Sequence, residues 1–306
     1  MRNAAPVTKS FSRTSGSGWY RYSLFAVLWA LSLSLWWHSL IATLTLALAG
    51  DAYTHILLVF PISIALVYLE RNTVRFTVEW GFKSGVALML LGLLATAIAK
   101  WSSAISVDAR LSWNMFALVI FWIGCIVLCF GLRTFRSLVF PLCFLFLIVP
   151  IPEFALSRTV EWLQQQSALA ARIMFRCAGV PVTQDGIILS IPNLDIEVAR
   201  ECSSIRSSLM LVITTTVMSH LLLRSWWRKA VLVAVSVPLS VVKNGLRIFV
   251  IGELGTKVNP EFLDGNLHHH GGILFLALAL GGVSVLLWLL RRTETPNWRL
   301  SEEPLR

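Results

Sequence analysis

Long apolar runs separated by short polar and basic segments dominate the pattern of this chain. An apolar run of about 17–25 residues is the length that crosses a bilayer, so the pattern predicts about eight membrane-spanning helices. We expect these spans near residues 22–42, 53–70, 84–100, 112–131, 137–151, 205–223, 230–252 and 271–290. The fifth run is short and is compatible with a re-entrant or tilted segment. The fold class predicted from this pattern is an all-α integral membrane protein.

Composition agrees with this assignment. The chain is 56% hydrophobic and 14% charged, with 13 Trp and 17 Phe, whereas a soluble domain buries a core without so apolar a composition. The net charge of +10 raises the question of nucleic-acid binding. The basic residues lie mostly between apolar runs rather than in one basic domain, so orientation in the membrane explains them better, and we expect no nucleic-acid partner.

Lysine and arginine placement predicts the orientation. With the N-terminus in the cytoplasm, the inner segments carry most of these residues, and the short outer loops carry only Lys100, Arg110 and Lys257. An even number of spans then places both termini in the cytoplasm. We expect a flexible cytoplasmic lead at 1–20, one transmembrane domain at 21–292 and a cytoplasmic tail at 293–306.

The longest outer segment, 152–201, has structure of its own in the sequence. Residues 153–175 show helical periodicity, with Phe154, Val160, Leu163, Leu169 and Ile173 separated by polar residues, and predict an amphipathic helix lying on the outer face. Short β-branched runs separated by Asp-Gly and Pro-Asn follow in QDGIILSIPNLDIEVA and predict a small hairpin. That hairpin leads the chain to Cys202, at the outer start of the sixth span.

Two more polar features fall at the same end of their spans as Cys202. Arg247 stands about 17 residues into the seventh span, roughly 25 Å from its inner end, and LHHHGG at 267–272 directly precedes the eighth span. The topology therefore predicts a thiol, a guanidinium and an imidazole at one depth. A charged residue in an apolar span is costly and is a functional candidate.

These three groups suit nucleophilic catalysis. A thiolate is a nucleophile whose pKa falls beside a cation, a histidine can pass a proton to a leaving amine, and an arginine can hold an oxyanion. Arg206 lies one turn from Cys202 and Asn244 one turn from Arg247, so each pair can share a helix face.

Other interpretations remain open at this point. Cys202 can pair with Cys177 in a disulfide, and Arg247 can extend to the lipid headgroups. Lys243 is more typical of an extended or paired lysine than of a catalytic one. Tyr53 and His55, at the outer start of the second span, can reach the same cavity, although a lone interfacial histidine is usually structural.

A metal site is the least supported alternative. Consecutive histidines on a helix point in different directions, and no HExxH pattern is present. We expect no metal and no cofactor.

Five fragments together resemble the exosortase/archaeosortase family of multi-pass membrane cysteine transpeptidases over roughly residues 50–290. They are, in chain order, DAYTHILLVFPISIALVYLER, FPLCFLFLIVPIPEFAL, VARECSSIRS, KNGLRIFVIGEL and HHHGGILFL. Each is weak alone, but their order and common outer face make the similarity specific.

The resemblance implies a role for each site residue. Cys202 would be the nucleophile, Arg247 the essential arginine and His268, four residues before Gly272, the histidine. His269 and His270 stay possible, with His269 the next choice. Ser204 stands where the family usually has glycine, which leaves the substrate preference open.

The resemblance also implies the substrate. Family substrates are exported proteins that end in a short motif such as Pro-Glu-Pro, one transmembrane helix and a basic tail. Attack by Cys202 would leave a thioester, which an amine or water resolves, and Arg200, Arg206 and Arg247 could hold the motif's glutamate. We expect an inner-membrane enzyme with its site on the periplasmic face.

The alternative class is a transporter or flippase for a polysaccharide or a lipid-linked precursor. Such a protein would carry ionisable groups near the bilayer midplane and paired broken helices, whereas here they gather at one face and no repeat is visible. A non-catalytic assembly scaffold is a third possibility.

Overall fold

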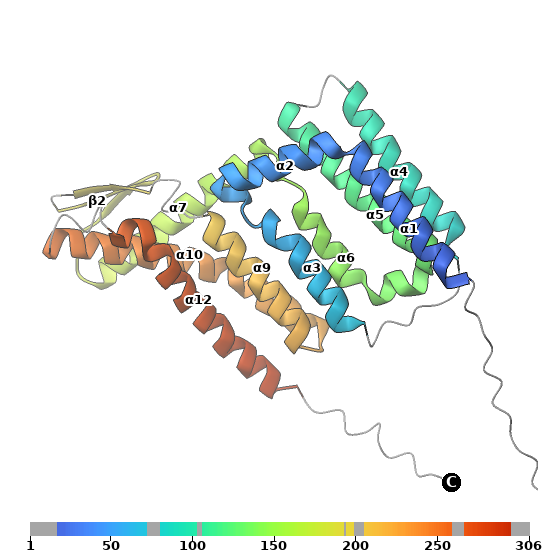
Figure 1. Cartoon of the computed structure of the whole chain (residues 1–306). Coiled ribbons are helices and arrows are strands. Elements are labelled where there is room, and N and C mark those ends of the chain that lie inside the picture. Colours follow the sequence, from blue (N-terminus) through green and yellow to red (C-terminus); the bar gives the residue numbers. More distant parts are fainter. Residues whose placement is uncertain are drawn as a thin grey trace, which may run out of the picture. The chain divides into compact units, whose positions relative to one another are not determined.

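The computed structural model describes residues 17–71, 80–102, 106–192, 194–198, 205–258 and 266–294. The chain forms two compact units, Met1–Pro152 and Glu153–Arg306, which are described here one at a time (Figure 1). The boundary between them coincides with the start of the predicted outer segment.

The first unit is helical. Its elements are α1 Ser17–Leu35, α2 Trp37–Ala49, η1 Asp51–Tyr53, α3 Ile56–Glu70, α4 Phe82–Trp101, α5 Val107–Ser137, α6 Val139–Phe144 and η2 Leu145–Ile148. Helix α5 is its core, because α1, α2, α4 and α6 all pack against it. Helix α4 lies alongside α5 (Figure 1), and this approach depends on Gly85, where an added Cβ would stand 2.6 Å from Cα of Leu128.

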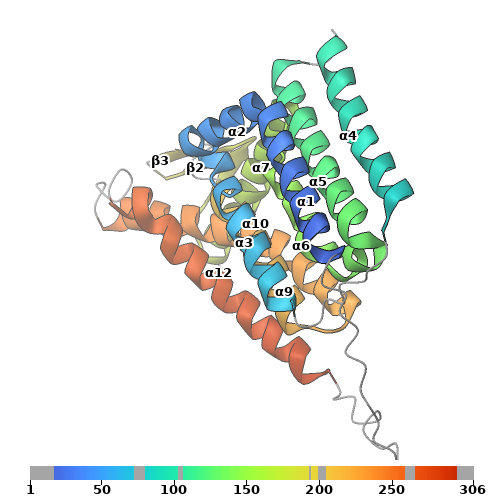
Figure 2. The same cartoon turned by 45° about the vertical axis from the view of Figure 1, so that its right-hand side comes forward.

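The second unit is built around one long helix. Its helices are α7 Glu153–Cys177, α9 Ile205–Leu222, α10 Trp226–Lys257 and α12 Asn266–Arg292. Helix α10 packs against α7, α9 and α12, and α12 also packs against α9 (Figure 2). Gly245 brings α10 close to α7, since a Cβ there would lie 2.6 Å from Cβ of Ala170.

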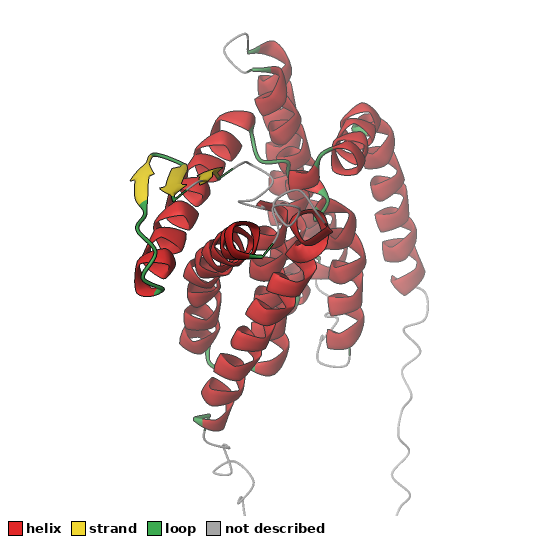
Figure 3. Ribbon diagram, turned by 90° about the vertical axis from the view of Figure 1, so that its left-hand side faces the viewer, coloured by secondary structure: helices red, strands yellow, loops and turns green. Residues whose placement is uncertain are grey.

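The predicted hairpin is confirmed and is extended by one strand. Strands β1 Thr183–Asp185, β2 Ile188–Ile191 and β3 Leu194–Glu197 form an antiparallel sheet in that order (Figure 3). Gly186 makes the first turn with φ of 58°, a conformation that favours glycine. Leu189 of the sheet is buried in a cluster with Phe175 of α7 and Ile248 of α10. The sheet therefore belongs to the core of this unit.

The predicted amphipathic helix is also confirmed, as α7. Its buried stripe includes Val160 and Ala171, whereas Phe154, Leu169 and Ile173, which the sequence periodicity suggested as part of the apolar face, are exposed. At 100° per residue these three positions fall well away from the line through Val160 and Ala171. The location of α7 on the outer membrane face stays a prediction.

Five helices of the described chain are long and apolar enough to cross a membrane: α4, α5, α9, α10 and Gly272–Arg292 of α12. The number rises to seven if two pairs of consecutive helices with short breaks each form one span. The first predicted span is such a pair, since α1 and α2 meet at 71°. The second predicted span is the shorter α3, of 15 residues.

Candidate functional site

The predicted site residues divide into three groups by what the structure describes. Cys202 and Arg200 lie outside the described residues. His268, His269 and His270 lie on the first turns of α12, of which the backbone is described. The described side chains are those of Arg206, Asn244, Arg247, Tyr53 and His55.

Arg247 is a buried cation within an apolar helix. Its side chain is 6% exposed, and Asn244, one turn earlier on α10, is 0% exposed. Burial at this level differs from the surface position of an arginine that extends to lipid headgroups. A guanidinium held inside a protein costs free energy unless other groups interact with it, so its presence inside the helix bundle indicates a functional or structural need.

Helix α12 meets Arg247 at a glycine. A Cβ built on Gly272 would lie 3.9 Å from Nη1 of Arg247, so this position of α12 faces the guanidinium. Position 268 lies one helical turn before Gly272, about 6 Å along the helix axis. Gly272, the last residue of the His-x-x-x-Gly pattern on α12, therefore lies next to Arg247 of α10.

A second buried cation lies one turn from the first. Lys243 is 4% exposed and donates a hydrogen bond to Oγ of Ser207, which is 8% exposed. This contact joins α10 to the first turn of α9. The sequence suggested an extended or paired lysine, and the partner in the structure is a hydroxyl on the neighbouring helix. Ser207 had not been singled out.

The chain that leads toward Cys202 is anchored at Val198. Nε2 of Gln164, on α7, donates a hydrogen bond of 2.7 Å to the carbonyl oxygen of Val198. The amide of Val198 donates to the carbonyl of Ile187 at 3.0 Å, and both Gln164 and Val198 are buried. Sequence reasoning missed Gln164, because nothing in the run Gln164 to Gln166 marks one residue as buried except the spacing from Val160.

The opposite end of α10 carries a polar cluster of its own. The carboxylate of Glu294 accepts hydrogen bonds from the amides of Arg224 at 3.0 Å and Ser225 at 3.1 Å. Arg228 lies 3.7 Å from the same carboxylate and donates to the carbonyl of Thr293 at 2.8 Å. The amide of Ser225, with smaller contributions from Arg224 and Arg228, lowers the pKa of Glu294.

The distance between the two polar ends suits a bilayer. Arg228 and Arg247 are separated by about 28 Å of helix, which is close to the hydrocarbon thickness of roughly 30 Å. The stretch of α10 between them is mostly apolar, and its charged residues, Lys229 and Lys243, lie close to its two ends. The spacing of Arg228 and Arg247 is therefore compatible with one membrane span.

Tyr53 and His55 make contacts within the first unit. Oη of Tyr53 donates to the carbonyl oxygen of Ile151 at 2.9 Å, and Nδ1 of the buried His55 lies 3.1 Å from the carbonyl oxygen of Ala52. Ser112 donates to the carbonyl of Pro150 at 2.7 Å. The Tyr-x-His fragment thus contacts the Pro-x-Pro fragment, and these contacts support a structural role for Tyr53.

The cysteines of the described chain are free. Cys125 and Cys129 are buried, while Cys143 and Cys177 are exposed, and no disulfide joins any of these four. The pairing of Cys177 with Cys202 involves a residue outside the described part. Among the described residues, no group of three or more His, Cys, Asp or Glu side chains is arranged to hold a metal ion.

Apolar helices of membrane-crossing length, with a buried guanidinium where α10 meets α12, are typical of a multi-pass membrane protein with a polar cluster between its helices. The model of the transmembrane exosortase family matches residues 36–285, which confirms the resemblance found in the sequence. The chain belongs to the transmembrane exosortase family. No curated protein and no solved structure matches it.

Proposed function

We propose that this exosortase is a membrane-embedded cysteine protease and transpeptidase that cleaves the C-terminal sorting signal of exported proteins. The observation that carries the proposal is the buried guanidinium of Arg247, which faces Gly272 at the start of an apolar helix. An oxyanion that forms next to such a cation, away from bulk water, is stabilised more strongly than in solution.

The helix pairing supports Cys202 as the nucleophile. Helices α9 and α10 are joined by residues 223–225 alone, as in an antiparallel pair, and Lys243 contacts Ser207. One turn further along α10 is Arg247, and α9 begins at Ile205, three residues after Cys202 in the sequence. The end of α9 that follows Cys202 in the chain is therefore the end that pairs with α10 near Arg247.

The periodicity of α12 ranks the three histidine positions. Phe275, Ala279 and Val283 are buried on the side of the helix that carries Gly272, and a period of 3.6 residues places position 268 on that side. Position 269 falls at the edge of that side, one turn before the exposed Ile273, and position 270 falls on the opposite side, one turn before the exposed Leu274. We infer that His268 serves, with His269 the next choice.

The proposed reaction uses these groups in two steps. The thiolate of Cys202 attacks the scissile carbonyl, Arg247 stabilises the oxyanion, and the histidine gives a proton to the leaving amine as the peptide C–N bond breaks. The transmembrane helix and basic tail leave, and a thioester remains. An amine or water then attacks the thioester, and the thiol is released with a new amide or a free carboxylate.

The membrane setting follows from the same assignment. We propose that the protein lies in the inner membrane with this site on the periplasmic side, where the motif of a sorting signal would emerge from the bilayer. The substrate's basic tail would then stay at the cytoplasmic side, at the end of α10 where the carboxylate of Glu294 lies.

A trapping experiment tests the proposal. The protein is co-expressed with an exported reporter that ends in a Pro-Glu-Pro motif, a transmembrane helix and an arginine-rich tail. We expect reporter cleavage and a hydroxylamine-sensitive thioester on the wild-type protein, and neither with Cys202→Ala, while Cys177→Ala retains both. Cleavage by the Cys202→Ala variant would rule out the thiol mechanism.

A further inference from the structure

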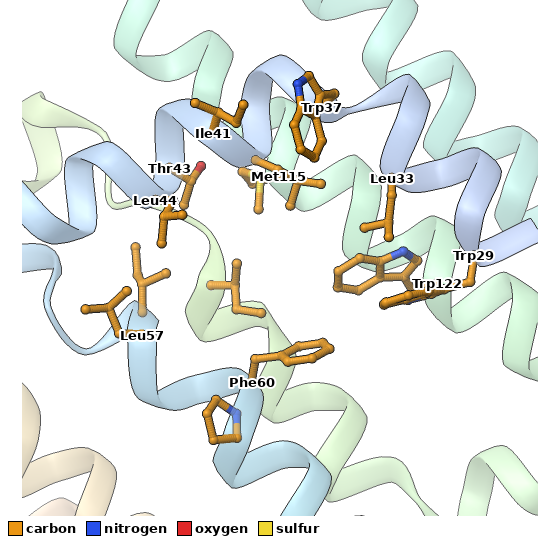
Figure 4. Close-up of a pocket in the computed structure, with 14 residues that line it drawn as sticks. Trp29, Leu33, Trp37, Ile41, Thr43, Leu44, Leu57, Phe60, Met115 and Trp122 are labelled. Carbon is orange, nitrogen blue, oxygen red and sulfur yellow. The ribbon is translucent and has the colours of Figure 1, made fainter. Parts of the chain in front are cut away.

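Two apolar cavities lie in the first unit and share part of their lining. One has a volume of about 540 Å³ and the other about 470 Å³, and Trp29, Phe60 and Trp122 line both. Figure 4 shows the smaller cavity, in which these three aromatic residues lie together and Thr43 contributes a side-chain oxygen. The two cavities therefore adjoin and form one groove between α1, α3 and α5.

One end of this groove carries a positive charge. Arg71, which caps α3, lines the larger cavity, and its guanidinium lies 3.7 Å from the ring centroid of Tyr68, another lining residue. Such a stack holds the guanidinium at the mouth of the cavity. The neighbouring carboxylate, Glu70, is not among the residues that line either cavity.

The rest of the larger cavity is apolar. Its other polar lining side chain, Ser63, donates its hydroxyl proton to the carbonyl of Pro141 at 2.8 Å. The cavity therefore offers a hydrocarbon-like interior with a cation at one end. That combination is complementary to a molecule with an anionic head and an apolar tail.

The length of the larger cavity matches one leaflet of a bilayer. Phe60 and Arg71, both on or at the end of α3, are separated by about 16 Å of helix. Half of a hydrocarbon core of roughly 30 Å is about 15 Å. An acyl chain that begins at Arg71 would thus end near Trp29, Phe60 and Trp122, where the second cavity begins.

We propose that this groove binds an acyl chain of an anionic phospholipid, with the lipid phosphate at Arg71. The lysine and arginine distribution predicts that Arg71 lies on the cytoplasmic side, so the lipid would come from the inner leaflet, where polybasic segments attract anionic lipids. This binding site is formed by residues of the first unit alone, and the proposal does not depend on peptidase activity.

A transmembrane helix of a sorting signal is the competing occupant. Its tail is basic, and it would bring arginines to the end of the groove that already carries Arg71. Like charges without a partner oppose binding there. Charge therefore favours the phospholipid.

Native mass spectrometry of the purified full chain tests the proposal. The protein is equilibrated with vesicles of phosphatidylethanolamine that contain a minority of phosphatidylglycerol, extracted in mild detergent, and analysed for retained lipid. We expect the wild-type protein to retain phosphatidylglycerol in preference to phosphatidylethanolamine. Arg71→Gln should reduce this preference about fivefold, the factor that corresponds to the ~1 kcal/mol of one basic residue at an anionic surface. Arg71→Lys should keep most of it.

A pair of tryptophan substitutions on α3 locates the acyl chain. Val67→Trp fills the larger cavity and should remove the retained lipid, while Leu69→Trp, at an exposed position outside the lining, should leave it unchanged. Equal headgroup preference in wild type and Arg71→Gln would overturn the proposal, as would full lipid retention by Val67→Trp. Displacement of the lipid by a peptide with a transmembrane helix and a basic tail, in the wild type but not in Val67→Trp, would identify the groove as a helix site instead.

Discussion

Lys243 of α10 donates a hydrogen bond to Ser207 of α9, and both side chains are buried one turn from the level of Arg247. This contact fixes the relative height of α10, which carries Arg247, and α9, which begins three residues after Cys202 in the sequence. A shift of one turn in this pairing would move α9 along α10 by about 5 Å, the pitch of a helix. The hydrogen bond is therefore expected to matter for stability and for activity.

Single and double substitutions of this pair should differ in a characteristic way. Ser207→Ala leaves a buried ammonium without its hydroxyl and should cost about 2 kcal/mol or more, while Lys243→Met leaves a neutral hydroxyl and should cost about 1 kcal/mol. Lys243→Met combined with Ser207→Ala should be more stable than Ser207→Ala alone. Thermal unfolding in detergent measures the order, and a double variant that is less stable than both single variants would contradict it.

The contact between Gly272 and Arg247 limits the size of the side chain that position 272 can carry. A Cβ at this position makes ordinary contact with Nη1 of Arg247, so Gly272→Ala should retain reporter cleavage, whereas the larger Gly272→Leu should displace the guanidinium and reduce cleavage at least tenfold. Gly281→Leu is a matched control, because no heavy atom lies within 4 Å of a Cβ at Gly281. Both leucine variants must accumulate in the membrane, and equal cleavage by them would show that Gly272 does not border the site.

The hydrogen bond from Gln164 to Val198 should hold the segment that leads to Cys202. Gln164→Leu leaves the buried carbonyl of Val198 without its donor, which should cost about 1–3 kcal/mol. It should also slow reporter cleavage, because the chain entering the nucleophile segment is no longer fixed to α7. Gln165→Leu, at an exposed neighbouring position, should leave the cleavage rate unchanged. Reporter cleavage rates of the two variants at equal membrane levels test this, and equal rates would contradict it.

Much of the fold could be predicted because an apolar run long enough to cross a bilayer forms a helix. Each predicted span contains helix in the structure, and the Asp-Gly turn at Gly186 predicted the hairpin. The bend between α1 and α2 could not be predicted in this way. It falls at Trp36, within a continuous apolar run that contains no glycine or proline near the break.

The site shows a similar division. Topology alone placed Arg247 near the start of the eighth span, and the structure puts its guanidinium beside Gly272. The contacts of Lys243 with Ser207 and of Gln164 with Val198 could not be predicted. Both depend on how neighbouring elements are rotated and shifted against each other, which the period of one segment does not determine.

The carboxylate of Glu294 should make a contribution to the stability of the folded state that is lost in acid. Its pKa is lowered from 4.5, chiefly by the amide of Ser225, so the carboxylate stabilises the folded state at pH values above 4.5 and this contribution is lost as the pH falls through the lowered pKa. Wild type should therefore exceed Glu294→Gln in melting temperature by a constant margin above about pH 6, and the margin should shrink on acidification. Melting curves of both proteins across pH 4–8 test this, and a margin that grows toward low pH would contradict it.

We expect Arg206 to affect the choice of substrate motif rather than the rate of the chemical step. Its side chain is exposed at the start of α9, four positions after Cys202, where it can meet the glutamate of a Pro-Glu-Pro motif. An exposed ion pair contributes up to about 1 kcal/mol, so Arg206→Gln should reduce the preference for a Pro-Glu-Pro over a Pro-Gln-Pro reporter by up to about fivefold. The cleavage rate of the Pro-Gln-Pro reporter itself should change little. Arg176→Gln, which removes an exposed arginine at the end of α7, serves as the control, and an unchanged preference in Arg206→Gln would assign the recognition of the glutamate to another residue.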